Sequence, residues 1–158
     1  MKKIVLTCFI VFCLASISYA QDYNTGIGLR AGFETGLTVK HFLGETSALE
    51  GILATRWRGF EITGLYEIQN PAFHADRLDW FFGFGAHIGF WNGDYTHDYW
   101  GYPGRTYSVV GIDGILGLEY NFKEVPINIG LDWKPAFNVI GYSGWWGDGG
   151  ALSIRYIF

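Results

Sequence analysis

The sequence lacks cysteine outside its first twenty residues, where Cys8 and Cys13 are found. This absence excludes a disulfide-bonded scaffold and a cysteine nucleophile from the rest of the chain. Beyond residue 20 there is no run of 18 apolar residues, which excludes transmembrane helices there. Basic residues are also scarce. After residue 20, 9 basic and 15 acidic residues remain, a formal charge of −6. No basic stripe is present, which argues against a nucleic-acid partner.

The first twenty residues have the three parts of a secretory signal peptide. Lys2 and Lys3 form a positive start, residues 4–15 are apolar, and Ser-Tyr-Ala at 18–20 is a small-x-small cleavage site. The apolar part is too short to span a bilayer, which takes about 20 residues. Neither cysteine lies at the cleavage point, which disfavours a lipoprotein anchor. We expect export and a mature chain from Gln21, with a retained anchor helix as the alternative.

Helical periodicity is missing from residues 21–158, and glycine recurs every few residues. Alternation of apolar and polar residues, the signature of strands, runs through eight segments. The expected strands are 24–34, 36–43, 48–57, 59–68, 78–91, 108–120, 127–137 and 149–158. The sequence therefore predicts one all-β domain over residues 21–158, after a signal peptide at 1–20.

The charged residues of these strands share one face. Because strand side chains alternate between faces, each segment divides into an apolar set and a glycine-rich polar set. All thirteen charges belong to the polar set: Arg30, Glu34, Lys40, Glu50, Arg56, Glu61, Glu67, Asp79, Asp113, Glu119, Asp132, Lys134 and Arg155. Such a pattern fits a soluble barrel or sandwich with the apolar set inside. It also fits a transmembrane barrel with the apolar set against lipid.

Three observations favour the transmembrane barrel. The polar face is rich in glycine, which suits a narrow lumen. The expected strands of about ten residues match a tilted membrane crossing. Aromatic residues also gather at the strand ends of the apolar face, as in interfacial girdles. They are Phe33, Trp57, Phe60, Tyr66, Trp80, Phe90, Tyr120, Trp133, Tyr156 and Phe158.

The carboxy-terminal stretch ALSIRYIF alternates up to its last residue, which suits a barrel whose last strand pairs with its first. With Tyr156 and Phe158 it resembles the terminal signal that the barrel-assembly machinery recognises in bacterial outer-membrane proteins. Together with the signal peptide and the absent cysteines, this ending resembles the small eight-stranded outer-membrane barrel family (OmpA/OmpX-type). The resemblance implies an eight-stranded antiparallel up-and-down transmembrane barrel in a Gram-negative outer membrane. It also implies outward loops after the first, third, fifth and seventh strands.

The expected lumen contains the thirteen charges and His87. Eight strands enclose a space that side chains just fill, so a wide pore is not expected. Buried charges persist when paired, which predicts networks of Arg or Lys with carboxylates. The main interpretation is a polar plug that supports the barrel. An ion or proton path through His87, Asp79 and Asp113 is the alternative.

Two expected outward loops are long, at 91–108 and 138–150, and both are rich in aromatic residues. Candidates for contact with an extracellular protein or glycan are Tyr95, Tyr99, Trp100, Tyr102, Tyr142, Trp145 and Trp146. Mutual packing, or contact with lipopolysaccharide headgroups, is the plainer interpretation. In the first loop Asp94, His97 and Asp98 are weak candidates for holding a divalent cation, because aspartates in loops more often form turns.

No catalytic motif or cofactor motif is recognisable. Barrel lipid A deacylases carry a His-x-Ser pair, which none of the four histidines forms. The expected function is therefore a structural or surface-interaction role as a monomer among outer-membrane lipids and lipopolysaccharide. A lipid-A-modifying enzyme is the first alternative. A soluble lipocalin-like carrier, with Trp80 and Phe84 inside the barrel, is the second.

Overall fold

The computed structural model describes residues 23–56, 59–73, 75–92, 106–141 and 143–158. These residues form strands and turns, and none of them lies in a helix that is long and apolar enough to cross a membrane. The strands are β1 Thr25–Gly32, β2 Thr35–Phe42, β3 Ser47–Arg56, β4 Gly59–Pro71, β5 Leu78–Asn92, β6 Thr106–Asn121, β7 Ile127–Trp133, β8 Ala136–Ile140, β9 Gly144–Trp146 and β10 Gly150–Ile157.

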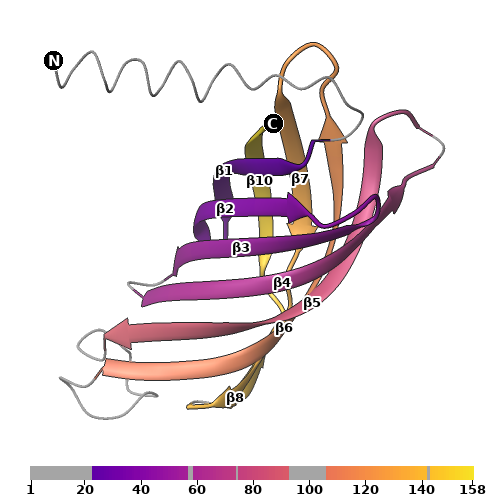
Figure 1. Ribbon diagram of the computed structural model, residues 1–158. Helices are drawn as coiled ribbons and strands as arrows, with labels where there is room; N and C mark the ends of the chain where they lie inside the picture. Colours follow the sequence, from indigo (N-terminus) through magenta and orange to yellow (C-terminus); the bar gives the residue numbers. More distant parts are fainter. Residues whose placement is uncertain (1–22, 57–58, 74, 93–105, 142) are drawn as a thin grey trace, which may run out of the picture.

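The strands close into an antiparallel barrel (Figure 1). Its wall has eight strand positions, which we call staves, and one stave can contain more than one strand. Consecutive strands pair from β1 to β6, and β6 then pairs with both β7 and β8. The seventh stave thus consists of β7 followed by β8. β10 pairs with β7 on one side and with β1 on the other, and this last pairing closes the barrel. The predicted all-β fold with eight antiparallel staves is confirmed.

The strand prediction was wrong in detail at the seventh stave. The expected strand 127–137 is interrupted at Lys134 and Pro135, because proline has no N–H to donate to a ladder. The carbonyl of Pro135 still accepts a hydrogen bond from the N–H of Gly114 at 2.9 Å, so the stave keeps its course. The predicted loop 138–150 is also partly strand, since β8 continues to Ile140 and pairs with the short β9.

The two faces of the barrel differ as the alternation predicted, with the apolar set outside. Leu29 is 66% exposed and Phe84 67% exposed, whereas Arg30 and Lys40 are buried. Within the described residues, the exposed Asp, Glu, Lys and Arg side chains all lie in turns: Glu45, Asp76, Arg77, Lys123 and Glu124. The carrier alternative is wrong, because the outward-facing Trp80 and Phe84 would have to lie inside.

Glycines on the inner face make room for large side chains. A Cβ at Gly117 would collide with the ring of Phe81, and one at Gly111 would collide with the imidazole of His87. At Gly28 the close neighbour is backbone, since a Cβ there would collide with the carbonyl of Ile154 on β10. The glycine-rich face is thus what lets eight strands close around a filled interior.

Candidate functional site: the charged lumen

One group of charges lies near the end of the barrel where the carboxy terminus lies, and we call it the terminal cluster. It consists of Lys40, Glu50, Glu67, Glu119 and Arg155, contributed by five different strands. The Lys40 ammonium lies 2.9 Å from a carboxylate oxygen of Glu67 and 2.9 Å from one of Glu119. The Arg155 guanidinium lies 2.5 Å from Glu50 and 3.7 Å from Glu119. These contacts join opposite walls through the lumen.

Neutral polar side chains complete the terminal cluster. The Tyr23 hydroxyl, from the segment before β1, donates to Glu119 at 3.0 Å. Burial and the neighbouring Glu119 carboxylate raise the pKa of Tyr23, so its phenol stays a donor. Gln69 accepts from Lys40 at 2.9 Å and donates to Glu119 at 2.7 Å. Asn128 accepts from Arg155 at 3.1 Å. Such hydrogen bonds are what make buried charges tolerable.

The second group is a pair, in which Arg30 on β1 contacts Asp132 on β7. The guanidinium donates two parallel hydrogen bonds to the carboxylate, at 2.5 and 2.6 Å. Both side chains have no exposed surface. This two-pronged geometry is the strong form of an arginine–carboxylate contact.

A third group, which we call the distal cluster, lies toward the other end of the lumen and consists of Glu34, Arg56, Glu61, Asp113 and Lys134. The Lys134 ammonium lies 3.2 Å from Glu34, 3.1 Å from Glu61 and 3.2 Å from Asp113. One ammonium thus serves three carboxylates from different parts of the wall.

The distal cluster is connected to the β9–β10 turn. The Arg56 guanidinium lies 2.5 Å from Asp148 and 3.8 Å from Glu34, and 5.2 Å from the centre of the Trp146 ring. A guanidinium over an indole face is a favourable cation–π contact. Arg56 therefore holds the segment after β9 against the mouth of the lumen.

His87 sits beside the distal cluster. Its Nδ1 lies 2.8 Å from Asp113 and its Nε2 lies 2.9 Å from the Asn138 side-chain oxygen. Ligand atoms of Glu61, His87 and Asp113 lie within 4.8 Å of one another, a donor set that divalent transition metals accept. The Lys134 ammonium already bonds two of these three residues, so the lysine supplies the positive charge that the carboxylates require.

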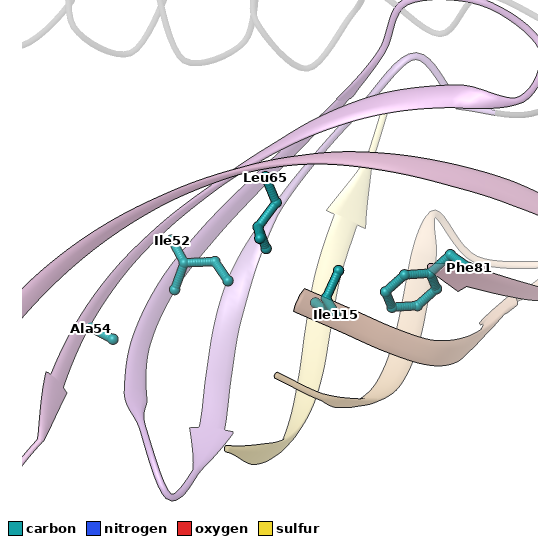
Figure 2. Packing of buried hydrophobic residues seen from close by; sticks show 5 residues of the cluster. All are labelled: Ile52, Ala54, Leu65, Phe81 and Ile115. Atoms are coloured by element: carbon teal, nitrogen blue, oxygen red, sulfur yellow. The ribbon is translucent and has the colours of Figure 1, made fainter. Parts of the chain in front are cut away.

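A group of buried apolar side chains, which we call the apolar plug, also lies in the lumen. It consists of Ile52, Ala54, Leu65, Phe81 and Ile115, whose buried side chains Figure 2 shows. On β4, Leu65 lies between Glu61 and Glu67, and on β6, Ile115 lies between Asp113 and Glu119. Because apolar side chains offer no partner to water or ions, the plug reduces the polar surface that lines the lumen between the terminal and distal clusters.

The structure places the predicted lumen residues inside the barrel, with Arg56 and Asp79 partly exposed and the others buried. It brings His87 and Asp113 together, but not Asp79, which accepts from Gln69 at 3.1 Å on the terminal side of the plug. The ion path through these three residues stays a prediction. Sequence alternation missed Tyr23 and Asp148, which lie outside the expected strands.

Most predicted loop candidates lie outside the described residues. These are the metal candidates Asp94, His97 and Asp98, and the aromatic residues Tyr95, Tyr99, Trp100, Tyr102 and Tyr142. Trp145 is 64% exposed, whereas Trp146 is half-buried against Arg56.

At the other end of the barrel, the Phe158 N–H donates to the Thr25 carbonyl at 2.9 Å, so the terminal residue is held by β1.

In comparisons with known proteins, the chain matches no family model and no curated protein.

Proposed function

We propose that this chain is a small integral barrel of a Gram-negative outer membrane, with a structural or surface-interaction role and a plugged lumen. The observation that carries the proposal is the inverted distribution of side chains. Charged groups fill the interior, while the outer wall is apolar between the turns. In water such a wall would be a very large exposed apolar surface, far beyond what soluble monomers show.

The height of this wall supports a membrane setting. Trp80 and Phe90 both face outward near opposite ends of β5. The two residues are ten positions apart. At about 3.4 Å per residue and a strand tilt of about 40° from the barrel axis, they are separated by about 26 Å along that axis. This height is close to the apolar band of roughly 25 Å on outer-membrane barrels. Outward aromatic residues lie toward the terminal end, among them Tyr120 and Tyr156, and toward the distal end, among them Phe60 and Trp133.

A charge on the outer wall tests the membrane setting. Leu29→Arg places a charge on the wall in the middle of β1, which costs about 2–4 kcal/mol at the middle of a bilayer but almost nothing in water. In cells that express the full chain, we expect less folded barrel of this variant in the outer-membrane fraction. The amount of folded barrel is measured by its heat-dependent migration in gel electrophoresis. Glu45→Arg, a change in an exposed turn, is the matched control. Equal yields of the two variants would refute the membrane assignment.

The surface-interaction role depends on the aromatic residues of the two predicted long loops. Among those that the structure describes, Trp145 is exposed. A photo-crosslinking residue at Trp145 in intact cells should give a discrete protein or glycan adduct. The same residue at Leu131, exposed on the wall of β7, is the control and should give lipid adducts. Lipopolysaccharide adducts alone at Trp145 would reduce the role to a structural one.

A further inference from the structure

The turn between β4 and β5 is strained. Among the described residues, the non-glycine residues with left-handed φ are Phe73 at 53° and Arg77 at 67°, and both lie in this turn. Such conformations persist where surrounding contacts fix them. Here the Ala72 N–H donates to the Leu78 carbonyl at 2.8 Å, and the Asn121 N–H donates to the Arg77 carbonyl at 3.0 Å. The ends of the turn are thus hydrogen-bonded to β5 and β6.

The strained turn forms one wall of an apolar depression on the outside of the barrel. The depression has a volume of about 260 Å³ and is lined by Pro71, Ala72, Phe73, Trp80 and Leu118. Trp80 and Leu118 are register partners on β5 and β6, and both face outward. Phe73 is 84% exposed, the highest value among the exposed large hydrophobic residues of the described chain. The turn therefore places an exposed aromatic ring beside the apolar depression.

Charges of both signs lie in this turn and in the turn that neighbours it. Asp76 and Arg77 are exposed in the same turn, and Lys123 and Glu124 are exposed in the turn between β6 and β7. The hydrogen bond from Asn121 to Arg77 joins the two turns. Each turn thus offers one cation, which suits a phosphate, and one carboxylate, which suits an amine. This pattern complements a zwitterionic headgroup better than a purely anionic one.

We propose that this region binds a phospholipid with a phosphate–amine headgroup, with an acyl chain in the depression and the headgroup at the two turns. The inference rests on the proposed membrane setting and names one lipid site within it. Phe73 would cover the acyl chain, and Arg77 would bind the phosphate.

The test uses the barrel purified from membranes and placed in nanodiscs that contain phosphatidylethanolamine with a photoreactive acyl chain. After irradiation, peptide mapping should find adducts concentrated on residues 71–80 and 118, relative to the wall around Leu152. Phe73→Asn removes the ring but keeps a residue that tolerates left-handed φ. It should reduce these adducts by about fivefold, because the depression loses one of the two aromatic rings that line it. Arg77→Asn should reduce them when the probe is diluted among other lipids.

Leu43→Ala, in the exposed turn between β2 and β3, is the matched control and should leave the adducts unchanged. Uniform labelling around the barrel, or equal labelling of Phe73→Asn and the control, would overturn the lipid site while leaving the membrane assignment standing. Failure of the wild-type barrel to enter nanodiscs at all would instead refute the membrane assignment. Heat-modifiability of each variant establishes that it is folded before it is labelled.

Discussion

The Arg30–Asp132 pair offers a direct measure of how the interior stabilises the barrel. Neither residue makes another ion pair within the described part of the chain, and both are fully buried. Arg30→Met or Asp132→Leu leaves one charge inside without its partner. We expect each single variant to lose about 3–5 kcal/mol in the free energy of unfolding, a roughly 150- to 5,000-fold loss in the folding equilibrium. Replacing both residues removes both charges and should restore most of the loss.

Equilibrium unfolding in urea, with the barrel refolded in detergent micelles or lipid vesicles, measures these differences. Glu45→Gln, in the exposed turn between β2 and β3, is the control and should change the free energy of unfolding by less than about 0.5 kcal/mol. The two single variants and the double variant form a cycle that isolates the pair interaction. If the single variants match the control, or if their losses simply add in the double variant, the pair does not stabilise the barrel as argued.

Three further variants test the lumen and the closure of the barrel. Lys134→Met should destabilise the barrel by more than about 3 kcal/mol in the same urea assay, because three carboxylates lose one shared cation. Phe81→Ala should cost about 3–5 kcal/mol through the cavity it leaves. In planar bilayers, Phe81→Ala should conduct more ions than the wild type. Unchanged ion conductance would show that the apolar plug does not restrict ion flow through the lumen. Gly28→Val should prevent pairing of β1 with β10, seen as loss of heat-modifiable barrel, and a folded variant would contradict that.

The alternation along the chain was enough to predict which residues face inward, because strand side chains alternate whatever the barrel contains. It did not predict the partners. Arg30 pairs with Asp132 and Arg155 with Glu50 across the lumen, and these choices depend on strand tilt and stagger. The plug around Phe81 was equally hidden, since its residues were placed on the inner face without any indication that they would meet.

The seventh stave shows a second limit of sequence reasoning. The predicted strand ran through Pro135 without a break. The continuation of pairing into β8 depends on contacts with β6, and the return through β9 depends on contacts with β8. Asp148 and Tyr23 joined the charged interior from outside the expected strands. Adjacent Trp145 and Trp146 gave no clear alternation, although the structure exposes the first and packs the second on Arg56.

The connections through the lumen also bear on how the barrel forms. Arg30 and Asp132 are 102 residues apart in sequence, Glu50 and Arg155 are 105 apart, and Lys40 and Glu119 are 79 apart. A partly assembled chain therefore has unmatched charges, and contacts of such long sequence separation form late. Folding should then be all-or-none, because a shortened chain gains little stability from the strands already made.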